Sequence, residues 1–144
     1  MFDENDNPRL FTQIVEILQS HLHIFWVDYE QHLIRGILTC RDGLGHFAVL
    51  TFDDTRWLRF FIALPAIDCV EPSSLRHLLR IQLANDRLSH VCFDDEHREL
   101  DIRSRAYLPT SSIAELVIPP VVQDLQSVLE DEQLIALIRQ KRAS

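Results

Sequence analysis

The sequence predicts an α+β fold, with helices packed on a mainly antiparallel sheet of about five to six strands. Apolar residues recur at helical spacing near both ends of the chain, and short runs rich in β-branched and aromatic residues lie between them. Turn-forming residues join most of these runs over hairpin length, which suits antiparallel rather than parallel neighbours. The expected element order is α-β-β-β(-β)-α-β-β-α.

The N-terminal segment predicts one amphipathic helix. Residues 1–7 are polar and are expected to be disordered. Asn7 followed by Pro8 is typical of an N-cap and a first helical position. Apolar side chains then recur three and four residues apart up to about residue 22, at Leu10, Phe11, Ile14, Val15, Ile17, Leu18 and Leu22.

The middle of the chain predicts strands on both sides of a second helix. The strands are expected at 24–29, 33–40, 47–52, 57–64, 88–93 and 99–108. The pattern leaves the existence of the first strand open, and the glycine-bearing segment 41–45 indicates a hairpin turn. Leucines at helical spacing predict a helix that is capped by Ser73 or Ser74 and ends at Asn85.

The C-terminal part, residues 112–144, is expected to be helical. Ser112 and Glu115 have the spacing of a capping box, which indicates where the helix begins. Pro119 and Pro120 lack the backbone N–H that a helix interior needs, so the helix is expected to break near them. A length of 144 residues fits one domain, and residues 1–144 are expected to form it.

Composition and charge restrict which partners and which cellular compartment are expected for this protein. The formal net charge is -8 at pH 7. An acidic protein repels phosphate backbones, so nucleic acid is not expected as a partner. Charged residues interrupt every apolar run before the length of a membrane span, and the N-terminus lacks the pattern of a secretory leader, so we expect a cytoplasmic protein with no membrane contact. Cys40, Cys69 and Cys92 are widely spaced and are expected to be reduced thiols.

Both faces of the predicted sheet are apolar over its first strands. Side chains alternate between the two faces of a strand. Residues 57–64 therefore divide into Leu58, Phe60, Ile62 and Leu64 on one face and Trp57, Arg59, Phe61 and Ala63 on the other. An antiparallel sheet in a lone monomer commonly leaves one face polar. The second face is expected to be covered by a helix, since the first and last helices could lie on opposite faces, or else by a second protomer or a client.

The composition of the second face favours a partner. Trp57 and Phe61 flank Arg59, and aromatic residues and arginine are enriched at protein interfaces. The residues expected to bind a partner are Trp57, Arg59, Phe61, Phe47 and Val49. Binding is expected through groove packing on this face or through strand addition at a neighbouring edge.

The sequence contains no recognised catalytic or cofactor-binding motif. The patterns G-x-x-x-x-G-K-[ST], G-x-G-x-x-G and G-x-S-x-G do not occur. His90 and His97 flank an acidic turn and could supply metal ligands, but a solvated, charged turn is the favoured interpretation. Arg103 and Arg105 could form an anion-facing strip, although solvated or ion-paired surface is the favoured interpretation. No catalytic residue, metal or cofactor is expected.

Three segments and the element order carry a resemblance to a known fold. Residues 78–85 (LLRIQLAN) end a predicted helix and run into residues 88–94 (LSHVCFD). After an acidic turn come residues 99–106 (ELDIRSRA) and then the C-terminal helix. Over about residues 8–138 the chain resembles the type III secretion chaperone-like fold, and within it the YbjN-type family of small bacterial proteins.

The resemblance implies a binding protein without chemistry of its own. Secretion chaperones of this fold are small, acidic homodimers that hold an extended client segment, whereas YbjN-type members are regarded as regulatory or stress-linked proteins. The resemblance therefore implies a homodimeric chaperone or adaptor, or alternatively a regulatory subunit of a larger cytosolic assembly. A metal-assisted enzyme acting through His90 and His97 is the least favoured alternative.

Overall fold

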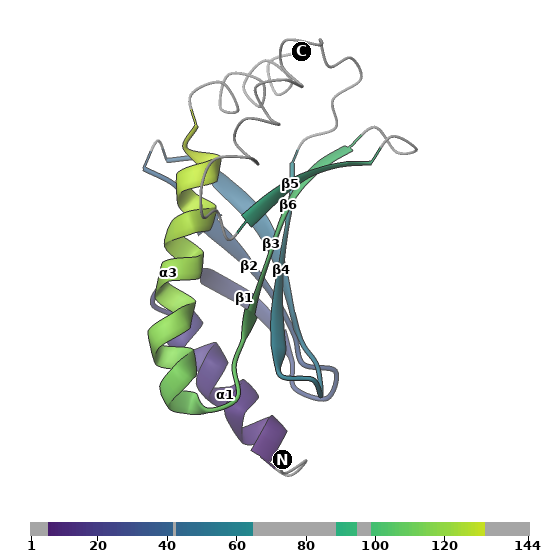
Figure 1. Cartoon of the computed structure of the whole chain (residues 1–144). Coiled ribbons are helices and arrows are strands. Elements are labelled where there is room, and N and C mark those ends of the chain that lie inside the picture. Colours follow the sequence, from purple (N-terminus) through teal and green to yellow (C-terminus); the bar gives the residue numbers. More distant parts are fainter. Residues whose placement is uncertain (1–5, 42, 65–88, 95–98, 132–144) are drawn as a thin grey trace.

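A computed structural model describes residues 6–41, 43–64, 89–94 and 99–131. Its elements are α1 (Asp6–Leu18), β1 (His23–Asp28), β2 (Leu33–Thr39), β3 (Gly45–Phe52), β4 (Trp57–Ala63), β5 (Ser89–Asp94), β6 (Glu99–Tyr107) and α3 (Ser111–Leu129). The strands form one sheet in the order β1-β2-β3-β4-β6-β5, and every neighbouring pair is antiparallel (Figure 1). In the described part of the chain, β1 and β5 are the edges of this sheet.

This architecture confirms the predicted α+β class and its antiparallel sheet. All six predicted strands are present, including the first, whose existence the sequence left open. The helix expected to end at Asn85, the turn residue His97, Cys69 and the C-terminal residues 132–144 lie outside the described residues.

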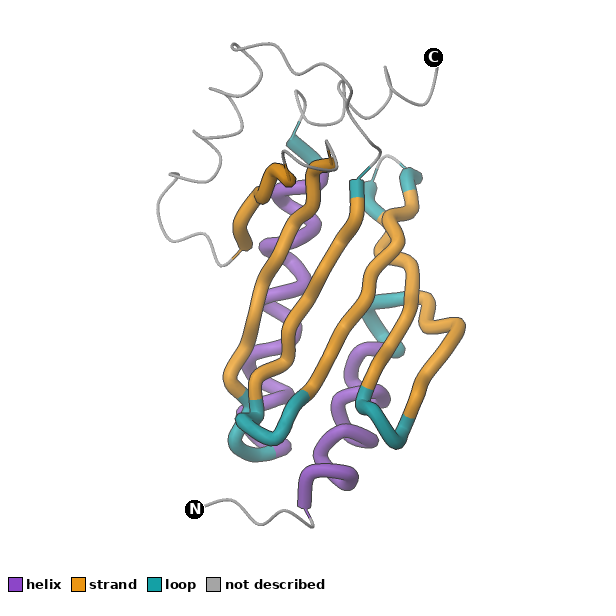
Figure 2. The backbone as a smooth tube through the Cα atoms, turned by 90° about the vertical axis from the view of Figure 1, so that its right-hand side faces the viewer, coloured by secondary structure: helices purple, strands orange, loops and turns teal. Residues whose placement is uncertain are grey.

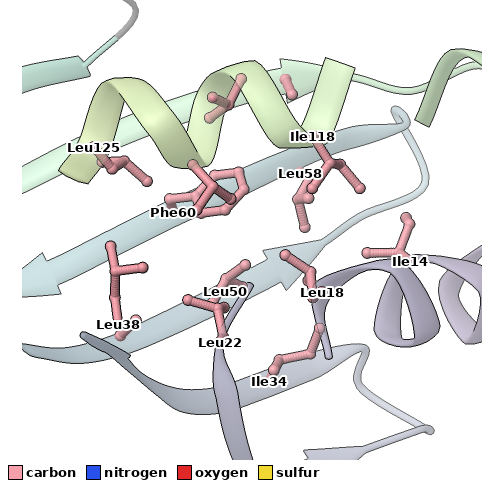
Figure 3. Close-up of a cluster of buried hydrophobic side chains, with 14 of the residues drawn as sticks. Ile14, Leu18, Leu22, Ile34, Leu38, Leu50, Leu58, Phe60, Ile118 and Leu125 are labelled. Carbon is pink, nitrogen blue, oxygen red and sulfur yellow. The ribbon is translucent and has the colours of Figure 1, made fainter. Parts of the chain in front are cut away.

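The core lies between one face of the sheet and the two described helices. α1 and α3 contact each other and cover the same face, as Figure 1 and Figure 2 show from two directions. The alternative in which the first and last helices lie on opposite faces is therefore wrong. The core side chains labelled in Figure 3 are Ile14, Leu18, Leu22, Ile34, Leu38, Leu50, Leu58, Phe60, Ile118 and Leu125.

The start of α1 differs from the prediction. Asp6 and Asn7 are helical rather than disordered, so Asn7 lies inside the helix and is not its N-cap. Asn7 is 5% exposed, and its Nδ2 atom donates to Asp54 Oδ1 at 3.4 Å. These contacts tie the start of α1 to the turn between β3 and β4. The helix ends at Leu18, earlier than predicted, although Leu22 still reaches the core.

The start of α3 also differs from the prediction. Thr110 is the N-cap, because its Oγ1 atom accepts a hydrogen bond from Ile113 N at 3.2 Å. The capping box predicted at Ser112 and Glu115 is therefore wrong, and the helix begins before Ser112. In the described residues, no helix is long and apolar enough to cross a lipid bilayer.

The predicted break at Pro119 and Pro120 is wrong, because α3 runs through both prolines to Leu129. Two prolines remove the hydrogen bonds that the carbonyls of Glu115 and Leu116 would otherwise accept. Both of these residues are exposed, so water can donate to their carbonyls instead. Burial of the inward side of α3 against the sheet outweighs the loss of the two bonds.

Neighbouring side chains on β3 point to opposite faces of the sheet, so substitutions there test which face packs against the core. Leu50 is fully buried, whereas its neighbour Val49 points to the other face and is partly buried. Leu50→Ala is expected to lower the free energy of unfolding by about 2–5 kcal/mol, because it leaves a cavity. Val49→Ala should cost less than about 1 kcal/mol. Urea unfolding measures both, and equal losses would contradict a core on one side only.

Candidate functional site

The sheet face opposite α1 and α3 carries the residues that the sequence selected for partner binding. Figure 2 shows this face toward the reader, with both helices behind the strands. No element among the described residues lies over it. We call it the open face. Its residues on β1 to β4 and β6 include Phe25, Trp26, Arg35, Ile37, Phe47, Val49, Thr51, Trp57, Arg59, Phe61, Asp101, Arg103, Arg105 and Tyr107.

All five predicted residues lie on the open face. Phe47 and Phe61 are 44% and 39% exposed, Arg59 is exposed, and Trp57 and Val49 are partly buried. Val49 on β3 lies directly opposite Phe61 on β4. Phe47 and Trp57 lie nearer the two ends of the face, because β3 and β4 run in opposite directions. The structure thus places the five side chains on one continuous surface.

A β-bulge in β1 adds two aromatic side chains that the sequence reasoning missed. The register of β1 with β2 shifts between Ile24 and Trp26, which leaves Phe25 as the extra residue. Trp26 then pairs with Arg35, and the Phe25 ring centre lies 5.7 Å from that of Phe47. Phe25 and Trp26 are 50% and 39% exposed. Alternation could not place them, because a bulge changes which side chains point to each face.

Arginine side chains of the open face stack on its aromatic rings. The guanidinium-to-ring distances are 4.7 Å for Arg35 on Trp26, 4.8 Å for Arg105 on Trp57 and 5.4 Å for Arg103 on Phe61. The Trp57 ring also contacts Tyr107, with ring centres 5.3 Å apart. Cation–π contacts at exposed sites contribute roughly 0.5–1 kcal/mol each. They also hold long, flexible side chains against the sheet.

Two acidic side chains pair with arginines of the open face, Asp53 at its border and Asp101 on the face itself. Asp53 pairs with Arg59 and accepts hydrogen bonds from the backbone and the hydroxyl group of Thr55. Burial raises the pKa of Asp53, but the hydrogen bonds from Thr55 and Arg59 outweigh it, so the pKa lies below its ordinary value. Asp101 accepts a hydrogen bond from Arg103 Nε at 2.9 Å. Both carboxylates are therefore bound to arginines of the face.

A hollow of about 420 Å³ lies on the open face. Its lining residues are Val49, Thr51, Arg59, Phe60, Phe61, His90, Arg103, Ser104 and Arg105. Val49, Arg59 and Phe61 are among the residues that the sequence selected. Its lining combines the apolar side chains of Val49 and Phe61 with three arginines, two of which are paired with Asp53 and Asp101.

The described histidine and cysteine residues offer no metal site. No group of three His, Cys, Asp or Glu side chains that could hold a metal converges in the described ranges. His90 lines the hollow instead. Burial first, and then the charge of Asp101, raise the pKa of the Cys92 thiol against the opposing effect of Arg103. This thiol is therefore uncharged at neutral pH and is a weak nucleophile.

Comparison with known proteins finds similarity in structure. No family model matches the chain, and no curated protein matches its sequence. A chain of the heterodimeric ExoU–SpcU complex from the type III secretion system of Pseudomonas aeruginosa has a TM-score of 0.51 at 15% identity, over 72% of this chain and 84% of that chain.

Two further solved structures are similar over more of the chain. A chain of the ExsC–ExsE complex has a TM-score of 0.49 at 14% identity, over 90% of this chain and 92% of that chain. The Yersinia pestis type III secretion chaperone SycH, in complex with a fragment of YscM2, gives 0.45 at 13% identity, over 93% and 98%. The likeness to the ExoU–SpcU complex, together with the sheet and helix order, confirms the secretion chaperone-like fold.

The Asp53 carboxylate is expected to make stability depend on pH. Its pKa is lower in the folded protein, so its contribution is present above the unfolded pKa and is lost as the pH falls through the folded pKa. Asp53→Asn should lower the free energy of unfolding by less than about 1 kcal/mol at neutral pH, because solvent screens this exposed pair. Urea unfolding of both proteins over a pH series measures the difference. A difference that persists below the folded pKa would contradict this assignment.

Proposed function

We propose that this chain is a non-enzymatic protein-binding module, a chaperone or adaptor that holds a segment of a partner protein on the open face. The observation that carries the proposal is a continuous surface of exposed apolar side chains over which no described helix lies. Exposed apolar patches mark interaction sites, and aromatic residues with arginine are typical of interfaces. The central contacts are assigned to Trp57, Arg59, Phe61, Phe47 and Val49.

The structural likeness adds support. One similar chain belongs to the heterodimeric ExoU–SpcU complex, so a protein with this fold is found bound to a second protein. The YbjN-type alternative, a regulatory or stress-linked subunit, would use the same face and differ only in its partner. Recovery of one secreted substrate indicates a chaperone, whereas recovery of a housekeeping complex indicates regulation.

Photo-crosslinking tests whether the open face contacts a partner. Benzoylphenylalanine in place of Phe61 should crosslink a partner protein in cells that produce the chain naturally. The matched control is the same amino acid at Leu116, which is 71% exposed on α3, on the other side of the molecule. Crosslinking at Leu116 should be much weaker. Equal yields at both positions, or no crosslink at Phe61, would contradict the proposal.

Substitution of the apolar contacts should abolish binding without unfolding the protein. Trp57→Asp places a charge where an apolar contact is proposed, so it should remove the Phe61 crosslinks. Leu116→Asp makes the same kind of change on α3 and should leave them intact. Circular dichroism melting curves of both variants should stay close to wild type. If Trp57→Asp unfolds the chain instead, Trp57 belongs to the core and the assignment of the face is wrong.

The proposal includes self-association as a homodimer, which the resemblance to secretion chaperones implies. Light scattering coupled to size exclusion, over a dilution series, should give a mass of about twice the 16.8 kDa of the chain. A monomer at every concentration would contradict the homodimer. The Phe61 crosslinks would then test separately whether a single chain binds a partner.

A further inference from the structure

The open face concentrates positive charge in an acidic protein. The formal net charge of the chain is -8, yet Arg35, Arg59, Arg103 and Arg105 all lie on this one face. The other arginines of the described ranges lie elsewhere: Arg9 on α1, Arg41 after β2 and Arg56 before β4. Asp53 and Asp101 pair with Arg59 and Arg103, so the positive charge of the open face that has no carboxylate partner among the described residues lies on Arg35 and Arg105.

The sheet places two of these arginines directly opposite each other. Arg59 on β4 pairs with Arg105 on β6. Like charges at such cross-strand positions destabilise a sheet. Asp53 neutralises Arg59, but in the described part of the chain Arg105 has no carboxylate partner. A bound anion would neutralise Arg105 in the same way.

Contact with the aromatic rings holds the guanidinium groups in an orientation that can bind a carboxylate. Arg105 lies on Trp57 and Arg35 lies on Trp26, and Arg35 also has no carboxylate partner among the described residues. A guanidinium group contacts a ring through its flat face and keeps its N–H groups, which lie in the plane, available to a carboxylate. Because stacking already restricts these side chains, less conformational entropy is lost when an anion binds.

The hollow brings these charges together with apolar contacts. Arg59, Arg103 and Arg105 line it alongside Val49 and Phe61. Its volume of about 420 Å³ is at the small end of ligand sites and holds a few side chains rather than a folded domain. A short segment could place a carboxylate against the arginines and an apolar side chain on Val49 and Phe61.

We propose that the open face binds an extended acidic segment of a partner protein, in which Asp or Glu residues are interspersed with aromatic or aliphatic residues. This inference rests on the proposed function and names the chemistry of the partner. Carboxylates of the segment bind Arg105 and Arg35, and its apolar side chains pack on Phe61 and Val49.

Charge argues against two other occupants. A two-fold interface uses the same patch in both copies, so a second chain on this face would bring Arg35 and Arg105, which have no carboxylate partner among the described residues, against a patch of the same charge. Single-stranded RNA carries a charge at every nucleotide, and the net charge of -8 repels it. A short peptide carries few charges, so local pairing with arginine outweighs that repulsion.

Fluorescence anisotropy with three labelled probes tests the inference. The first is a peptide of about twelve residues with Glu interspersed among Phe and Leu, long enough to cross the strands of the face. The second has Gln in place of every Glu, and the third is a single-stranded RNA of about the same length. The Glu peptide should bind at least about ten-fold more tightly than the Gln peptide at low salt, and added salt should reduce this advantage.

Matched variants locate the contact. Arg105→Gln should weaken binding of the Glu peptide about ten-fold and leave binding of the Gln peptide unchanged. Arg9→Gln removes the same charge from α1 and should change the affinity for the Glu peptide less than about two-fold. Melting curves establish that both variants are folded. Equal losses from the two variants would overturn the placement of the site on the open face.

The outcomes separate this inference from the proposed function. Equal affinity for the Glu and Gln peptides would overturn the acidic segment and leave a protein-binding face that works by apolar contact alone. Tighter binding of RNA, or a dimer that Trp57→Asp dissociates, would overturn it in favour of nucleic acid or a second copy. Binding of neither peptide would also overturn it, and the Phe61 crosslinks then decide the proposed function independently.

Discussion

The packing of α1 and α3 on one and the same face of the sheet is the constraint on which the rest of the structure depends. The central strands are apolar on both sides, so covering one side leaves the other exposed among the described residues. Leu50 and Leu58 are fully buried under the helices, whereas Phe47 and Phe61, on the same two strands, keep more than a third of their surface in solvent. Burying that surface against a partner is favourable by roughly 25 cal/mol per Å².

Arginine side chains lie over part of the aromatic surface of the open face. Arg35 and Arg105 hold their guanidinium groups over the rings of Trp26 and Trp57, which removes part of the ring surface from water. The same groups carry charges that repel an identical face. Under the proposed function, one set of side chains both covers the aromatic rings and selects partners by charge.

Strand periodicity predicted five of the six strands, left the first open, and placed Trp57 and Phe61 on one surface, because alternation is a local property that the sequence carries directly. Which face the helices cover was not predictable, since the apolar stripe of a helix fits either side of a sheet that is apolar on both. The predicted bounds of α3 were wrong because tertiary packing also decides where a helix begins and ends. Thr110 rather than Ser112 caps α3, and packing tolerates Pro120 inside the helix. The cross-strand arginine pair depends on β6 lying beside β4, which no local pattern reveals.

The bulge in β1 bears on how a partner contacts this sheet. Strand addition needs a regular row of free backbone N–H and C=O groups along an edge, and a bulge interrupts that row and twists the strand. In β1 the interruption falls at Phe25, in the middle of a six-residue strand, so little regular edge is left on either side. The same bulge turns Phe25 and Trp26 toward the open face. At this side of the sheet, the local geometry therefore favours packing of a segment across the side chains of the open face over hydrogen bonding of an added strand.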